Sequence, residues 1–163
     1  MKRLAILGST GSIGQSALAV AAAHPDRLQV VALVAGENAS LLADQASQFR
    51  PTVIGMASDA ALADLTSRIG ITSGTMLLPS GPDGLVAAAT HPDVDVVLCA
   101  TSGSAGLEAA LAAIDAGKTL ALANKEVMVM FGERAVERAR RRGVSIRPVD
   151  VEHNAIHRCR HGR

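Results

Sequence analysis

Short apolar runs alternate with longer segments rich in alanine and leucine along almost the whole chain. The apolar runs are continuous, a pattern typical of strands that are covered on both faces. They predict strands at 3–7, 29–35, 52–57, 94–100, 119–123 and 144–149, with a weaker strand at 75–78. The intervening segments predict helices at 13–23, 39–49, 60–69, 107–116 and 126–142, with a short helix at 85–89. This repetition predicts an α/β fold, a Rossmann-type open, mostly parallel sheet with helices on both faces.

Composition narrows the possible classes of function. The 163 residues suit one domain, and the net charge of +1 argues against binding nucleic acid or anionic membranes through bulk electrostatics. The chain lacks Trp and Tyr and has only two Phe, which leaves almost no stacking surface for single-stranded nucleic acid. No uninterrupted apolar stretch reaches the roughly 18 residues of a membrane span, and the first apolar run ends at Gly8, too early for a secretory signal. We therefore expect a cytoplasmic protein without nucleic-acid or membrane partners.

The sequence GSTGSIG at residues 8–14 joins the first predicted strand to the first predicted helix. Glycines spaced three apart let the backbone turn tightly and approach a diphosphate, and the helix N-terminus adds free N–H groups and a positive dipole end. The hydroxyls of Ser9, Thr10 and Ser12 add further donors. The candidate cofactor contacts in this loop are Gly8, Thr10, Gly11, Ser12, Ile13 and Gly14. The alternative is a tight strand-to-helix turn that binds no ligand.

Gly36, Glu37 and Asn38 follow the second predicted strand, where the adenosine ribose of a bound dinucleotide lies in this kind of fold. A carboxylate there accepts a hydrogen bond from the 2′-hydroxyl of NAD, whereas a 2′-phosphate favours a basic partner. Glu37 taken alone therefore indicates NAD or NADH. The alternative is a glutamate in a solvated loop.

Asn124, Lys125 and Glu126 come directly after the predicted strand at 119–123 and open the next helix. In an open parallel sheet, ligands bind beyond the carboxyl ends of the strands. Lys125 is suited to hold a phosphate or polarise a carbonyl oxygen, and Asn124 is suited to orient a nicotinamide. The alternative makes Asn124 an N-cap and Glu126 a favourable charge in the first helical turn, and both interpretations can hold together.

Asp150 and Glu152 follow the last predicted strand. Residues two apart in an extended segment point the same way, so these carboxylates can face one hard cation. Oxygen ligands of this kind suit Mg²⁺ or Mn²⁺.

Together these segments resemble the 1-deoxy-D-xylulose 5-phosphate reductoisomerase family over residues 1–156. The resemblance rests on LGSTGSIG at 7–14, ALVAG at 32–36, LANKE at 122–126, PVD at 148–150 and EHNAI at 152–156. It implies an NADPH-dependent oxidoreductase of the non-mevalonate isoprenoid pathway. Such enzymes rearrange 1-deoxy-D-xylulose 5-phosphate, a sugar phosphate, and reduce the product to 2-C-methyl-D-erythritol 4-phosphate. It further implies a Mn²⁺ or Mg²⁺ ion as Lewis acid and a homodimer for the full-length protein.

The resemblance also implies roles for individual residues. Cofactor contacts carried over by match are residues 10–13, Gly36, Asn38, Asn124 and Glu126; Lys125 and Glu152 are catalytic and contact substrate, and Asp150 and Glu152 bind the metal. Two positions depart from the family pattern. Glu37 stands where the family usually has a basic residue, so NADH is possible in place of NADPH. Val151 stands at a substrate-binding position that is usually serine, and valine offers no hydroxyl.

The family's remaining catalytic region would follow Arg163. We therefore expect an NAD(P)-binding Rossmann domain over 1–149 and the start of a truncated catalytic domain over 150–163. This chain alone should bind cofactor but show little turnover. Two alternatives stay open, a non-catalytic nucleotide-binding module and another Rossmann oxidoreductase.

Overall fold

The computed structural model describes residues 1–69, 74–102, 104–123 and 125–149, with only the backbone at 125–128, 130 and 131. The strands are β1 (Lys2–Leu7), β2 (Leu28–Ala35), β3 (Val53–Met56), β4 (Met76–Leu77), β5 (Val96–Cys99), β6 (Thr119–Leu122) and β7 (Ile146–Pro148). The helices are α1 (Ser12–Ala23), α2 (Ala39–Phe49), α3 (Asp59–Ile69), α4 (Pro82–Thr90), α5 (Ala105–Asp115) and α6 (Lys125–Arg142). The predicted elements are confirmed, with small differences in their bounds. Helix α4 starts earlier than predicted because Pro82 is accommodated in its first turn.

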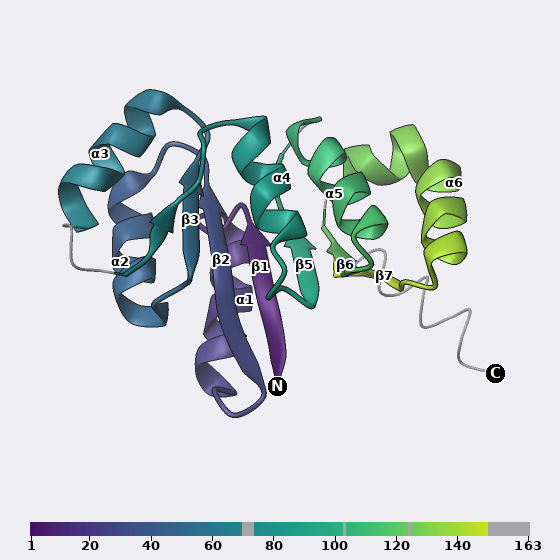
Figure 1. The fold of residues 1–163 in the computed structure, drawn as a ribbon, viewed down its shortest axis with the longest axis horizontal. Coiled ribbons are helices and arrows are strands. Elements are labelled where there is room, and N and C mark those ends of the chain that lie inside the picture. The colour runs from purple at the N-terminus through teal and green to yellow at the C-terminus, as the bar shows by residue number, and fades with distance from the viewer. Residues whose placement is uncertain (70–73, 103, 124, 150–163) are drawn as a thin grey trace.

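All seven strands pair in parallel, in the order β4-β3-β2-β1-β5-β6-β7. The strand order reverses at β1, which pairs with β2 on one side and with β5 on the other (Figure 1). In open α/β sheets, ligands bind in the crevice that this reversal opens beyond the carboxyl ends of the strands. The predicted fold class is therefore confirmed, and the topology indicates where a site should lie.

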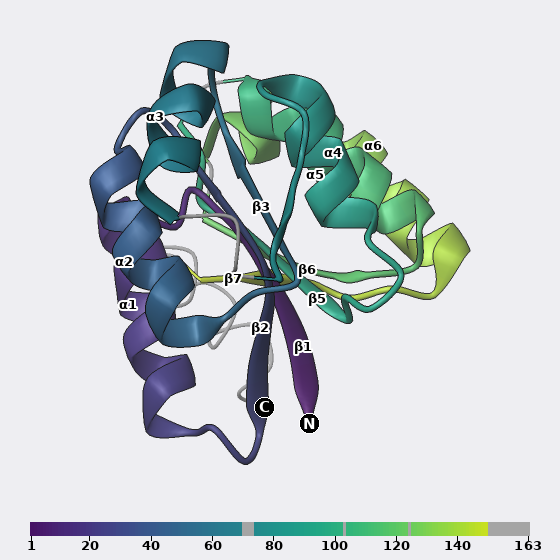
Figure 2. The same cartoon turned by 60° about the vertical axis from the view of Figure 1, so that its left-hand side comes forward.

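Helices cover both faces of the sheet, α1 to α3 on one side and α4 to α6 on the other (Figure 2). The core beneath α1 to α3 includes Leu18, Leu42 and Leu65. The core beneath α4 to α6 includes Ala88, Ala109 and Ala135. Small alanines let α4, α5 and α6 pack closely. Among the described residues, none of the helices combines the length and apolar character needed to cross a bilayer.

Two helices are followed by a glycine in the left-handed region. Gly117 follows the end of α5 with φ 74°, and Gly143 follows α6 with φ 66°. Glycine is favoured at these positions because a left-handed residue terminates a helix at little steric cost. Each helix thereby turns into the next strand, β6 or β7.

Arg3 and Asp95 join β1 to the segment entering β5, at the end of the sheet opposite the crevice. The Asp95 carboxylate accepts hydrogen bonds from the Arg3 backbone N at 2.9 Å and from Nε and Nη2 at 3.1 and 2.9 Å. The bonds from the Arg3 side chain, and then that from its backbone, lower the pKa of Asp95 from 3.8 to about 2. Because the folded-state pKa is depressed, the stabilisation is present above about pH 4 and is lost as the pH falls towards 2.

Asp95→Asn is expected to lower the free energy of unfolding at pH 7 by about 1 kcal/mol, the upper range for a partly exposed ion pair. The difference between wild type and variant should close between about pH 4 and pH 2, because the wild-type carboxylate is then protonated. Urea unfolding followed by circular dichroism at several pH values measures this difference. Asp93→Asn is the matched control, since the Asp93 side chain is 57% exposed and contacts Arg3 at 3.3 Å. A difference in the free energy of unfolding that stays constant down to pH 2 would contradict the stabilising role of the ionised Asp95 carboxylate.

Candidate functional site

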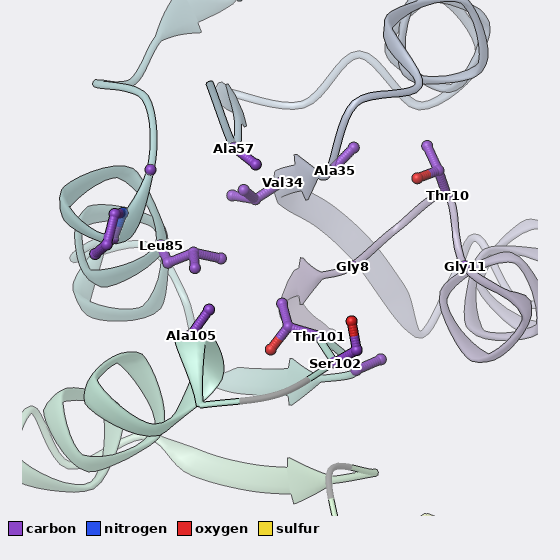
Figure 3. A pocket seen from close by; sticks show the side chains of 14 residues that line it. Gly8, Thr10, Gly11, Val34, Ala35, Ala57, Leu85, Thr101, Ser102 and Ala105 are labelled. Carbon is purple, nitrogen blue, oxygen red and sulfur yellow. The ribbon is translucent and has the colours of Figure 1, made fainter. Parts of the chain in front are cut away.

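A cleft of about 350 Å³ lies at the carboxyl ends of β1, β2 and β5, where the strand order reverses. Its lining residues are Gly8, Thr10, Gly11, Val34, Ala35, Gly36, Ala57, Gly81, Pro82, Leu85, Ala100, Thr101, Ser102 and Ala105. Thr10 and Gly11 lie across the cleft from Leu85 and Ala105 (Figure 3). None of these lining residues is charged, so a ligand in the cleft meets backbone amides, hydroxyls and apolar surface.

Gly8 and Gly14 hold the 8–14 loop close to the rest of the fold. Gly8 has φ 88°, and a Cβ there would lie 2.6 Å from the backbone O of Ala100 on the neighbouring strand's continuation. A Cβ on Gly14 would lie 2.6 Å from the Cα of Ser9. The Gly8 and Ser9 amides also donate to the carbonyl of Val34 at 2.8 and 3.0 Å. Both glycines are therefore required by close backbone packing inside the protein.

Gly11 lines the cleft as Gly8 does, but close backbone packing does not require a glycine at this position. It is the N-cap of α1, with φ −75° and ψ 171°, and no side chain caps this helix among the described residues. Its first turn carries no acidic residue. A Cβ on Gly11 would meet only the carbonyl O of Gly8, at an ordinary contact distance of 3.5 Å. The amide groups and the positive dipole end of α1 are thus open to an anion in the cleft.

The 8–14 loop is braced from α2 by a residue that the sequence did not point to. The Nε2 of Gln45 donates to the Ser9 carbonyl at 2.9 Å, and both residues are buried. Ser9 is fully buried, so the expectation that its hydroxyl lines the site is wrong: the strand-to-helix turn places this side chain beneath the loop. Gln15 adds a second brace, its Nε2 donating to the Thr10 carbonyl at 2.8 Å. A polar residue on the inner face of a predicted helix was the only signal for Gln45.

The other predicted cofactor contacts lie around this cleft rather than all within it. Ser12 is exposed and Ile13 is half-buried in the first turn of α1. Asn38 is the N-cap of α2, its Oδ1 accepting from the Leu41 amide at 3.0 Å. Glu37 is exposed beyond the end of β2 and accepts a hydrogen bond from the Ser58 hydroxyl at 2.8 Å. Of the predicted cofactor contacts whose side chains the structure describes, Gly8, Thr10, Gly11 and Gly36 line the cleft itself.

Thr101 and Ser102 form part of the opposite wall and were not predicted from the sequence. Two hydroxyl residues directly after a buried strand were the available signal. Cys99, at the end of the same strand, is fully buried, and burial raises the pKa of its thiol. The thiol therefore stays protonated and packs as a small apolar group.

The remaining predicted site residues fall at the limit of what the structure describes. Lys125 opens α6 directly after β6, and Glu126 follows it, so the backbone here is at the same sheet edge as the cleft. Asn124, predicted to contact cofactor, lies outside the described residues. The predicted metal and substrate positions Asp150, Val151 and Glu152 also lie outside them.

A protein-family model matches most of the chain. The model of 1-deoxy-D-xylulose 5-phosphate reductoisomerase matches residues 4–132. The chain belongs to this family. A reductoisomerase of Anaeromyxobacter dehalogenans is 53% identical over 157 residues, which cover 96% of this chain and 40% of that relative. The chain thus spans about two-fifths of the length of the curated reductoisomerases that it matches.

Solved reductoisomerase structures agree with the fold described above. A crystal structure of a reductoisomerase with NADPH, fosmidomycin and magnesium matches with a TM-score of 0.91 and 41% identity, covering 98% of this chain and 39% of that one. The reductoisomerase of Zymomonas mobilis with NADPH matches with a TM-score of 0.90 and 40% identity, covering 97% and 41% of the two chains. Membership of this family sets aside the alternative of another Rossmann oxidoreductase.

Proposed function

We propose that this chain is the dinucleotide-binding part of a reductoisomerase that converts 1-deoxy-D-xylulose 5-phosphate to 2-C-methyl-D-erythritol 4-phosphate. The observation that carries the proposal is the cleft at the strand reversal, where an uncapped helix N-terminus opens beside Gly11. The family membership supplies the reaction, and the two NADPH-containing structural neighbours support a nicotinamide dinucleotide phosphate as reductant.

The cleft fits such a cofactor because the lining residues that the structure describes are uncharged, and glycine removes side chains where a diphosphate would lie. The amides of the first turn of α1 and the backbone at Thr10 and Gly11 would hold the diphosphate. Gly36 would border the adenosine ribose, and the β5–α5 turn with Thr101 and Ser102 would border the nicotinamide end. When bound, the cofactor supplies the hydride for the reduction.

The roles beyond this cleft are part of the same proposal. Asn124 and Glu126 would contact the cofactor, and Lys125 would contact substrate from the sheet edge. Asp150 and Glu152 would hold a Mg²⁺ or Mn²⁺ ion, with Val151 beside the substrate. Residues 1–149 would form the NAD(P)-binding domain and 150–163 the beginning of the catalytic domain. The proposed setting is a homodimer in the cytoplasm.

Titration of the chain with NADPH, followed by the fluorescence of the reduced nicotinamide, tests this proposal. We expect saturable binding to one site, with ADP-ribose as a competitor because it carries the same diphosphate. Adenosine, which lacks the diphosphate, should compete much more weakly. If neither NADPH nor NADH binds a folded sample at millimolar concentration, the proposal is wrong.

A further inference from the structure

The edge of the cleft beyond Gly36 is formed by the ends of β2 and β3. The Ala57 amide donates to the Gly36 carbonyl at 3.1 Å, and both residues line the cleft. In this fold the residue after the second strand meets the adenosine ribose. Chemical groups around Gly36 and Ala57 therefore decide whether a 2′-hydroxyl or a 2′-phosphate is accommodated there.

Two carboxylates stand at this edge, and each is held by a serine hydroxyl. Ser58 Oγ donates to Glu37 Oε2 at 2.8 Å, and Ser80 Oγ donates to Asp59 Oδ1 at 2.5 Å. The Ser58 hydroxyl also accepts a hydrogen bond from the Ala61 amide at 3.2 Å, within the first turn of α3. Ser58 thus uses its one proton on Glu37, and that proton is not available to a phosphate.

The same edge offers no cation to balance these charges. The described segments that form it, 36–40, 57–59 and 79–82, contain no Lys, Arg or His. A ribose 2′-phosphate carries close to two negative charges at neutral pH and would face Glu37 and Asp59 without a basic partner. A ribose diol instead has hydroxyl protons to donate to a carboxylate, and a charged acceptor strengthens that bond.

We propose that Glu37, fixed by Ser58, is a specificity-determining residue that makes this chain bind NADH at least as tightly as NADPH. The inference rests on the proposed function, since it assumes a nicotinamide dinucleotide in the cleft, and it concerns only the ribose edge.

The test is a pair of titrations, NADH and NADPH, on wild type, Glu37→Lys and Glu37→Gln at one ionic strength. We expect a wild-type dissociation constant for NADPH equal to or larger than that for NADH. Glu37→Lys should shift the ratio of the two constants towards NADPH by about ten-fold or more, because a lysine there forms a charge-assisted hydrogen bond with the 2′-phosphate. Glu37→Gln should shift it in the same direction by less.

Asp26→Lys is the matched control, because it makes the same change in net charge. Asp26 is exposed and lies in the turn before β2, at the opposite end of the strand that Glu37 follows. It should leave the ratio unchanged. A wild-type dissociation constant smaller for NADPH than for NADH, or an unchanged ratio in Glu37→Lys, would overturn the inference while leaving the proposed function intact. Absence of binding by both cofactors would instead overturn the proposed function, and the inference with it.

Discussion

Gly11→Asp is expected to weaken NADPH and NADH binding at least about 100-fold while leaving the fold as stable as wild type or more so. Aspartate is a preferred N-cap residue, and the extended backbone at Gly11 suits it. Its carboxylate would take the amides of the first turn of α1, which are the groups that a diphosphate needs, and would repel the diphosphate. The acidic charge at the helix N-terminus should itself add roughly 0.3–1 kcal/mol of stability. Fluorescence titration and thermal unfolding measure the two effects separately.

Gly11→Asn is the control for this prediction, since asparagine also caps a helix but carries no charge. Its binding should fall by much less than that of Gly11→Asp, while both variants stay folded. Unchanged cofactor affinity in Gly11→Asp would show that no anion is held at this helix terminus. A loss of affinity accompanied by unfolding would also count against it, because the cap is expected to preserve α1.

Gly14→Ala is expected to destabilise the protein by about 3 kcal/mol, the upper end of the range for overpacking. The added Cβ would meet the Gly8 carbonyl and lie 2.6 Å from the Ser9 Cα, and backbone atoms have no alternative rotamer. For a chain of this size the melting temperature should fall by roughly 6–12 °C. Cofactor affinity should fall too, because α1 must move away from the loop. Differential scanning calorimetry and the same titration measure these changes.

Gly132→Ala is the matched control for Gly14→Ala, because Gly132 also lies within a helix but a Cβ there has no neighbour within 4 Å. Alanine should stabilise α6 by about 0.5–1 kcal/mol through its helix propensity. Gly14→Ala should therefore lower the free energy of unfolding, and Gly132→Ala should raise it. A stability loss of similar size in both variants would mean that the close approach of α1 to the loop is not what Gly14 provides.

Much of the site could be predicted because its position follows from local sequence. A glycine loop between a buried strand and a helix has few conformations available, so the sequence alone predicts that Gly8, Gly11 and Gly36 border a ligand. Leu85 was not predicted, because nothing near it in sequence marks a binding wall. Thr101 and Ser102 were missed although they follow a buried strand, since two hydroxyl residues are also common in a solvated loop. Gln45 was also missed, since it lies 36 residues from the Ser9 carbonyl that it braces.

The three glycines of the 8–14 loop have different structural roles, and only the structure shows which glycine has which role. The spacing of Gly8, Gly11 and Gly14 suggests a single function, ligand approach. The structure shows that Gly8 and Gly14 make room for backbone within the protein, whereas Gly11, which lines the cleft together with Gly8, has space for a side chain. The difference depends on where Ala100 and Ser9 lie.

The sequence by itself determined the parallel α/β architecture, because continuous apolar strands and glycine-terminated helices leave little other way to bury both faces of a sheet. It also determined that a glycine-rich loop at 8–14 joins a strand to a helix and that a carboxylate, Glu37, follows the second strand. Only the tertiary structure decided that Glu37 accepts a hydrogen bond from Ser58 and that Asp59 lies at the same edge of the cleft. The described segments that form this edge contain no Lys, Arg or His. Local patterns reflect neighbours along the chain, whereas the charge around a ribose is set by side chains that meet only when separate strands end at one edge.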